Sequence, residues 1–277
     1  MKCKWCVCDM DGTLLNSDGL ISIENESALK KLQEMGIEVI IASGRTDLMM
    51  KSYIKQLELK GHIICCNGGL VKKIETDEVI YKKLIDKETA EKVIKYCFEN
   101  AVNFLVYTID MVYSNSENQR AKYYENLNSS LSQEFRIPID YIEYAEIDKL
   151  LEKDIFKVLI IEKDDERKDS IARHFSDVTE LAVVTSAKGL LDIMASGVSK
   201  GDAIKKLSEE LKIDLKEVIA FGDNYNDLEM FEAVGFPVAM ENAVEDIKAH
   251  SKFITRSNDE SGVAYAIDNL FLKHKQS

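Results

Sequence analysis

The chain has 277 residues, with 36 lysines and arginines against 49 aspartates and glutamates, which gives a formal net charge of −13. Hydrophobic residues make up 45% of it, enough for a buried core, and this excludes global disorder. So large an excess of acids argues against nucleic acid and anionic membranes as partners, because long-range repulsion opposes every encounter. A small phosphorylated ligand is not excluded, because the local field decides its binding.

The N-terminal third alternates strands with helices. Apolar and β-branched runs predict buried strands over residues 5–8, 37–42 and 62–66. Between the first two strands, Ser22 is a typical N-cap and Gly36 a typical stop for a helix, and a second helix is predicted over 46–59. Strands that are apolar throughout and separated by helices are typical of a parallel sheet covered on both faces.

The pattern changes near residue 70. Short strands separated by turn residues predict hairpins, and a few amphipathic helices lie among them. The predicted hairpins are 70–74 with 79–84 and 103–108 with 111–115, the later strands are 155–161, 181–185 and 190–195, and the helices are 86–100 and 165–175. Hairpins mixed with helices favour an α+β module over more parallel sheet.

Strand–helix alternation resumes after residue 196. Ser199 opens a predicted helix that runs to 211, followed by strands and helices in turn at 218–221, 227–233, 236–240 and 243–249. The fold class is therefore α/β. We predict a discontinuous, Rossmann-like core with a doubly wound parallel sheet, made of 1–82 and 190–277, and an inserted α+β cap domain over 83–189.

Chemistry-bearing residues follow the core strands. Asp9 and Asp11 come after the first strand, and Ser43, Gly44 and Arg45 after the second. The sequence GDNYND, which holds the acids at 223 and 227, follows the strand at 218–221. Ligands of an open parallel sheet bind outside the carboxyl ends of its strands, so these segments should meet at one edge.

Four carboxylates at one edge would repel one another without a cation. Hard oxygen ligands of this kind suit Mg²⁺. The plainer interpretation is that each aspartate is a helix cap or loop residue, which fits Asp223 or Asp227 alone. It explains the whole set poorly, because all four fall on the same edge. Lys200 and Ser43, ordinary surface and turn residues when taken singly, would complete a phosphate cradle beside such an ion.

These motifs as a set identify a resemblance. The chain resembles the haloacid dehalogenase superfamily of phosphotransferases in its D-x-D-G-T sequence at Asp9, its serine after the second strand, its downstream Lys200 and its G-D-x-x-N-D sequence. The stretch GLLDIMASGVSK, which ends at Lys200, and the insertion of about 105 residues resemble the Cof-like branch with a type IIB (C2B) cap. The resemblance covers nearly the whole chain.

The resemblance implies roles for the site residues. Asp9 is the nucleophile that forms an aspartyl-phosphate, and Asp11 the general acid and then the general base, which calls for a higher pKa at Asp11 than at Asp9. Mg²⁺ is held by the Asp9 and Asp223 carboxylates and the Asp11 backbone carbonyl, with Asp227 supporting that shell. The expected substrate- and phosphate-binding residues are Ser43, Gly44, Arg45, Asn67, Gly68, Lys200 and Asn226.

The leading functional hypothesis is a Mg²⁺-dependent phosphomonoester hydrolase for small phosphorylated metabolites. Sugar phosphates come first by resemblance, and pyridoxal phosphate and flavin mononucleotide remain open. A phosphohexomutase of the same superfamily is the second hypothesis. The third is a receiver-like signalling module, which would need neither Asp11 nor the insertion.

The remaining features favour a cytoplasmic protein. Asp9 and Asp11 interrupt any apolar signal region, and the longest uncharged run, 62–71, falls far short of the roughly 18–20 residues that span a bilayer. The six cysteines lie mainly in strand-like runs and are predicted to be reduced core thiols. The tyrosines of the insertion, with Arg120 and Lys122, are predicted to pack its core. The sequence leaves the oligomeric state open and is compatible with a monomer.

Overall fold

The computed structural model describes residues 2–272, with side chains for all of them except 186, 187 and 272. The chain divides into two compact units. The first contains Met1–Gly44, Ser52–Tyr81 and the chain from Ser199 onward, and the second contains Arg45–Lys51 and Lys82–Val198. The segment with Arg45 and the strand near residue 190 therefore belong to the second unit. The domain boundaries expected from the sequence, 82/83 and 189/190, stay a prediction.

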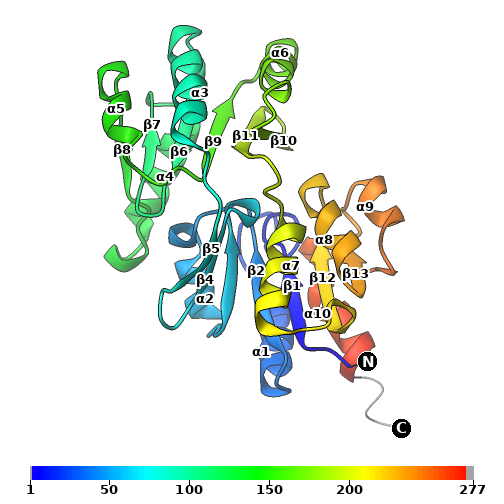
Figure 1. The fold of residues 1–277 in the computed structure, drawn as a ribbon. Coiled ribbons are helices and arrows are strands. Elements are labelled where there is room, and N and C mark those ends of the chain that lie inside the picture. The colour runs from blue at the N-terminus through cyan, green and yellow to red at the C-terminus, as the bar shows by residue number, and fades with distance from the viewer. Residues whose placement is uncertain (1, 273–277) are drawn as a thin grey trace. The chain divides into compact units, whose positions relative to one another are not determined.

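The first unit is built on an eight-stranded sheet in the order β14-β13-β12-β1-β2-β3-β4-β5 (Figure 1). Its strands are β1 (Trp5–Cys8), β2 (Glu38–Ala42), β3 (His62–Cys65), β4 (Leu70–Lys73), β5 (Val79–Lys82), β12 (Val218–Gly222), β13 (Phe236–Ala239) and β14 (Phe253–Ile254). From β14 to β3 every neighbouring pair is parallel, and β4 then pairs antiparallel with β3. The central strand β1 pairs with β2 on one side and β12 on the other, so it is buried throughout.

Helices connect the parallel strands and cover the sheet. They are α1 (Ile23–Glu34), α2 (Lys51–Gln56), α7 (Lys200–Leu211), α8 (Leu228–Ala233), α9 (Glu245–Ala249) and α10 (Gly262–Ile267). Helix α1 packs beside α10, and α7 packs beside α8. Both faces of the central strands are apolar and buried, which is the arrangement expected of a doubly wound sheet.

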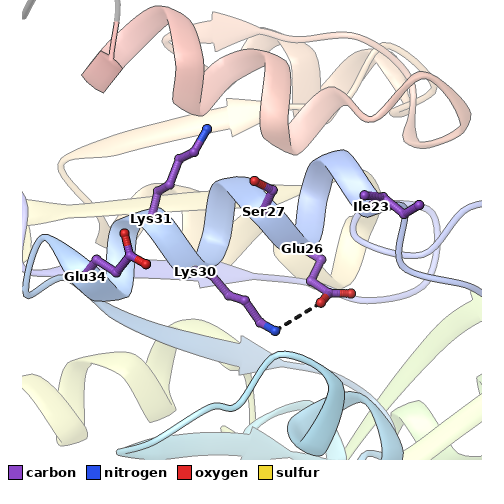
Figure 2. Close-up of a pocket in the computed structure, with 6 residues that line it drawn as sticks. All are labelled: Ile23, Glu26, Ser27, Lys30, Lys31 and Glu34. Atoms are coloured by element: carbon purple, nitrogen blue, oxygen red, sulfur yellow. Dashed lines mark hydrogen bonds and ion pairs between the residues drawn. The ribbon is translucent and has the colours of Figure 1, made fainter.

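Helix α1 illustrates how a local sequence sets an element. The Ser22 side chain accepts a hydrogen bond from the Asn25 amide and so caps the first turn. On the opposite face, Lys30 pairs with Glu26 at 3.0 Å (Figure 2). Figure 2 shows the six residues that line one surface pocket, and all of them belong to this helix.

The second unit is built on a six-stranded sheet in the order β10-β11-β9-β6-β7-β8. Its strands are β6 (Asn103–Tyr107), β7 (Val112–Ser114), β8 (Ile139–Tyr141), β9 (Lys157–Ile161), β10 (Leu181–Ala187) and β11 (Leu190–Ala195). All pairs are antiparallel except β7 with β8. Its helices are α3 (Lys87–Glu99), α4 (Gln119–Ser130), α5 (Ile147–Leu150) and α6 (Asp165–Ser176).

The two faces of this sheet differ. Phe104 and Val106 of β6 point to a large apolar core shared with α3, α5 and α6. Leu105 and Tyr107, which alternate with them, point to the other face and pack with Tyr124 of α4 in a smaller cluster. The second face therefore carries the smaller of the two apolar clusters.

The α/β fold class and the strand–helix order predicted from the sequence are confirmed in the described residues. The helix predicted over 46–59 is wrong as one element: a 3-10 turn at Asp47–Met49 precedes the shorter α2. That turn belongs to the second unit, where Met49 packs beside Leu105, whereas most of α2 belongs to the first. The segment 119–130, predicted only to pack the insertion, forms helix α4.

All six cysteines are thiols, and five of them are buried. Burial raises the pKa of Cys3 to about 11 and that of Cys97 to about 12. Such groups are weak nucleophiles at neutral pH, so the prediction of structural thiols is confirmed. Within residues 2–272, no helix combines the length and the apolar character that crossing a membrane requires.

Candidate active site

The site lies in the first unit, at the carboxyl ends of its three central strands. Asp9 directly follows β1, Ser43 follows β2, and Asp223 follows β12. Because β1 is the parallel neighbour of both other strands, these ends lie side by side. The pairing of β1 with β12 continues as far as the site, because the Asp9 backbone amide donates to the Phe221 carbonyl at 3.0 Å. The edge expected to gather the chemistry is therefore formed.

Lys200 is the centre of the charge cluster. Its side chain is fully buried and its Nζ donates to Asp9 Oδ1 at 2.5 Å and to Asp227 Oδ1 at 2.6 Å. Lys200 is the first residue of α7, whose N-cap Ser199 accepts from the Asp202 amide. The helix start thus fixes the lysine between two aspartates that lie far apart in the sequence.

Asp227 and Asp223 are connected through the loop after β12. Asp227 Oδ2 accepts from the backbone amides of Asp223 and Asn224 at 2.9 and 3.2 Å. Asp223 Oδ1 accepts from the Thr13 hydroxyl at 2.8 Å. Asp227 therefore holds the loop that carries Asp223, which agrees with the supporting position expected for it.

The burial of this cluster changes the acidity of its members. Burial raises the pKa of the Asp9 carboxyl well above its usual range, and the charges of Asp227 and Asp223 add to this, although Lys200 opposes it. Burial and Asp227 also raise the pKa of Asp223 to about 6. Burial lowers the pKa of Lys200, but the two carboxylates outweigh it and raise that pKa, so the lysine carries its charge. A single ammonium does not balance three carboxylates.

The donor set fits a hard divalent cation. Asp9, Asp223 and Asp227 each offer a carboxylate oxygen, and these oxygens all lie within 4.8 Å of one another. Carboxylates that crowd at this distance in a buried site repel, and a small cation with oxygen ligands relieves that repulsion.

The neighbouring loop after β3 contributes amides and backbone. Asn67, in the left-handed region at φ 55°, accepts through Oδ1 from the Asn226 side chain at 3.2 Å. Its own amide donates to the Ser43 carbonyl at 2.9 Å. A Cβ on Gly44 would come within 3.0 Å of Asn67 Oδ1, and one on Gly68 within 2.1 Å of the Ser199 carbonyl. The structure thus brings Ser43, Gly44, Asn67, Gly68 and Asn226 together beside the cluster.

Two of the expected residues differ from the others. Arg45 belongs to the second unit, where its positive charge acts on Arg120. Asp11 is exposed, whereas Asp9 is the buried carboxyl with the raised pKa. The order expected from the sequence, with a higher pKa at Asp11 than at Asp9, stays a prediction.

Two contributors were not assigned from the sequence. The Thr13 hydroxyl donates to the Asp223 carboxylate, and the side-chain amide of Asn242 donates to the Gly12 carbonyl at 2.7 Å. Thr13 is the last residue of the D-x-D-G-T motif, so its position carried a signal. Asn242 lies outside every motif and carried none.

Replacing Gly12 with alanine should lower turnover at least tenfold. Gly12 adopts φ 79°, which a side chain rarely tolerates, and a Cβ there would lie 2.4 Å from Asp223 Oδ2. Alanine would therefore move Asp223 as well as strain the turn. Gly19→Ala, at φ 74° but with open space around it, is the matched control for backbone strain alone. Equal losses of turnover in the two variants would contradict the argument.

The comparisons with known proteins agree with this site. A model of the haloacid dehalogenase-like hydrolase family matches residues 6–267. The chain is 32% identical to the 5-amino-6-(5-phospho-D-ribitylamino)uracil phosphatase YwtE of Bacillus subtilis, over 98% of each chain. A haloacid dehalogenase-like hydrolase from Bacteroides thetaiotaomicron has a similar structure, with a TM-score of 0.86 and 29% identity, over 98% of this chain and 100% of that one. The subclass IIB sugar phosphatase BT4131 shares the fold at a TM-score of 0.80 and 23% identity, over 96% and 98%.

Fold, site and relatives together define the chain as a phosphatase, a hydrolase of phosphoric monoesters. It belongs to the haloacid dehalogenase-like hydrolase family, and it shares its fold with a sugar phosphatase of subclass IIB. The resemblance seen in the sequence is confirmed.

Proposed function

We propose that the chain is a Mg²⁺-dependent phosphomonoester hydrolase of small phosphorylated metabolites that works through an aspartyl-phosphate on Asp9. The observation that carries the proposal is the position of Asp9. Its carboxyl lies at the end of the central strand, touches the Lys200 ammonium at 2.5 Å and is grouped with the carboxylates of Asp223 and Asp227. A nucleophile for an anionic phosphoryl group needs such positive charge around it.

The Asp9 and Asp223 carboxylates and the Asp11 backbone carbonyl would hold Mg²⁺, with Asp227 fixing the loop of Asp223. When bound, the ion supplies positive charge that offsets the charge of the phosphoryl oxygens. Lys200 adds a second positive charge from the protein itself. Ser43 and Asn226 would donate hydrogen bonds to the remaining phosphoryl oxygens.

Asp9 and Asp11 then carry out the reaction in two steps. In the first, Asp9 attacks phosphorus, the bond to the leaving oxygen breaks, and Asp11 gives that oxygen its proton. In the second, Asp11 takes a proton from water, the water oxygen attacks the same phosphorus, and inorganic phosphate leaves with Asp9 restored. Each step conserves charge and protons without a further reactant.

The experiment that tests this function is phosphate release by the purified full-length chain from an aryl phosphate. We expect release with Mg²⁺ and none after EDTA. Addition of Mg²⁺ in excess of its Kd should also raise the melting temperature, because an ion bound only by the folded chain stabilises it by about 2.7 kcal/mol at 100 times Kd. The thermal shift is measured without substrate, so it separates ion binding from catalysis.

Full activity in EDTA would contradict the metal requirement. The variant Asp223→Asn should lose most of the thermal shift, because one carboxylate of the cluster is gone. Asp18→Asn, an exposed aspartate in the turn after the site, is the matched control and should keep the shift.

Asp11→Asn should harm alkyl phosphates more than aryl phosphates. An alkoxide is a poor leaving group and needs the proton that Asp11 would give it, whereas a nitrophenolate leaves readily without one. We expect kcat/KM for a sugar phosphate to fall about 10²–10⁴-fold, the usual contribution of general acid catalysis, and kcat/KM for p-nitrophenyl phosphate to fall less. Equal losses on both substrates would count against the acid role.

Sugar phosphates are the first candidates for the substrate. YwtE, at 32% identity, is named as a phosphatase of a phosphorylated ribitylamino compound, whose phosphate sits on a sugar-like polyol chain. A panel with that compound, hexose phosphates, pyridoxal phosphate and flavin mononucleotide separates the classes. The hexose 1-phosphate arm also tests a mutase, which would return isomerised sugar phosphate in place of inorganic phosphate. A cytoplasmic enzyme stays our expectation, and the oligomeric state stays open.

A further inference from the structure

The second unit carries a group of polar side chains on the face of its sheet that has the smaller apolar cluster. Tyr107 of β6 pairs in register with Lys157 of β9, and Asp192 of β11 pairs with the residue two positions after Lys157, so all three point to this face. They are almost completely buried. Helix α4 lies over this face and adds Tyr124, whose hydroxyl is 3.2 Å from that of Tyr107.

Arg120, in the first turn of α4, joins this group. Its guanidinium lies 5.3 Å from the centre of the Tyr124 ring. Its Nε is buried and has no hydrogen-bond partner among the described residues. A buried donor without an acceptor is destabilising, so this position is suited to an acceptor from outside the chain.

The charges of the group favour an anion. Arg120 and Lys157 bring two positive charges, and a third comes from Arg45, whose guanidinium acts on Arg120 with the repulsion of a like charge. Opposing them are Asp192, which pairs with Lys157 at 3.2 Å, and Asp47 on the segment of Arg45. Three cations against two carboxylates leave an excess of positive charge in a chain whose net charge is −13.

We propose that this tyrosine–arginine group of the second unit, centred on Arg120 and Tyr124, binds an oxyanion of a small molecule, either a carboxylate or a phosphate. The Arg120 fork presents Nε beside its terminal nitrogens, which matches the two oxygens of such a group. The Tyr107 and Tyr124 hydroxyls share one hydrogen bond, which leaves one of the two as a neutral donor beside it. The inference stands on residues of the second unit alone and does not depend on the phosphatase mechanism.

The test measures direct binding to the full-length protein in EDTA by isothermal titration calorimetry. The probes are inorganic phosphate and malonate, and the uncharged malonamide is the ligand control. We expect at least one of the two anions to bind with Kd of about 1 mM or tighter, which small ligands of five to seven heavy atoms reach in a good site. The tighter of the two identifies the oxyanion that the site prefers. Malonamide should not bind.

Arg120→Gln should weaken that binding about tenfold or more, because a charge-assisted hydrogen bond is lost. Lys122→Gln is the matched control: it removes the same charge from the same helix, at a lysine that is 55% exposed and faces Glu117. It should change Kd less than twofold. Arg120→Lys keeps the positive charge but loses the planar guanidinium. Its Kd should lie between those of Arg120→Gln and Lys122→Gln.

Tyr124→Phe gives a second measure that does not depend on the stability of an Arg120 variant. Loss of its hydroxyl should weaken binding about threefold to tenfold. The proposal is overturned if neither anion binds to the unaltered chain, or if Arg120→Gln and Lys122→Gln weaken binding equally. It is also overturned if binding survives the loss of both Arg120 and the Tyr124 hydroxyl. Failure of the phosphatase proposal shows up separately, as the absence of Mg²⁺-dependent phosphate release.

Discussion

Replacing Asp9 with asparagine should lower turnover by about three or more orders of magnitude, because a carboxamide is a poor nucleophile and cannot form the aspartyl-phosphate. The side chain keeps nearly the same size, so the buried packing at the end of β1 should persist. Steady-state release of phosphate from p-nitrophenyl phosphate gives the loss. Acid-quenched samples followed by mass spectrometry should show a phosphorylated chain in the unaltered protein and none in the variant.

Asp18→Asn makes the same chemical change in the exposed turn beyond the site and should keep turnover within twofold. Circular dichroism and the melting temperature check that Asp9→Asn still folds. Near-normal turnover in a correctly folded Asp9→Asn protein would contradict the covalent mechanism. A phosphorylated chain in that variant would instead place the nucleophile elsewhere.

Lys200→Met should lower the free energy of unfolding by about 3–5 kcal/mol in EDTA, and should also abolish activity. Lys200 is fully buried between Asp9 and Asp227. Methionine fills similar space but leaves two buried carboxylates without their cation, and breaking a buried ion pair from one side costs about that much. Chemical denaturation followed by circular dichroism measures the loss.

Lys205→Met, an exposed lysine on the same helix, is the matched control and should stay within about 0.5 kcal/mol of the unaltered protein. Adding Asp227→Asn to Lys200→Met should restore part of the lost stability, because one of the stranded charges is gone. The double-variant cycle should give a coupling of about 0.5–3 kcal/mol. Strict additivity would show that Lys200 and Asp227 act independently, contrary to their 2.6 Å contact.

Much of the candidate site could be predicted because parallel strands place their carboxyl ends together. Once 5–8, 37–42 and 218–221 are assigned as strands, the polar residues that follow them must meet at one edge. The pairing of β1 with β12 follows the same logic across more than 200 residues of sequence. The roles of these residues remain predictions that the experiments above test.

Helix α4 could not be predicted with the same rules. It buries only Ala121 and Tyr124 of its twelve residues, so it lacks the apolar stripe from which a helix is predicted. Its start is set by Asn118, whose side chain accepts from two amides of the first turn, a signal that is common in loops as well. The anion-binding group proposed for the second unit was therefore hidden in a segment that the sequence placed only as packing.

The loop after β3 shows a second limit. Cys66 and Asn67 both adopt positive φ, at 51° and 55°, ahead of Gly68 at 102°. Asparagine and glycine there suggest a turn, but a cysteine in this conformation is unusual and gives no local signal. The contacts of Asn67 with Asn226 and with the Ser43 carbonyl help to hold this turn.

The contact between Asp9 and Lys200 also has a consequence for how the chain folds. The two residues are 191 positions apart, and Thr13 and Asp223 are separated by 210. During synthesis, β1 leaves the ribosome long before β12, its partner on one side, so the first unit cannot close until the second has been made. The second unit is one uninterrupted stretch from Lys82 to Val198 apart from a short segment near Arg45. We expect the second unit to fold first during translation. The early strands of the first unit stay unpaired and accessible to chaperones until β12, β13 and β14 have been synthesised.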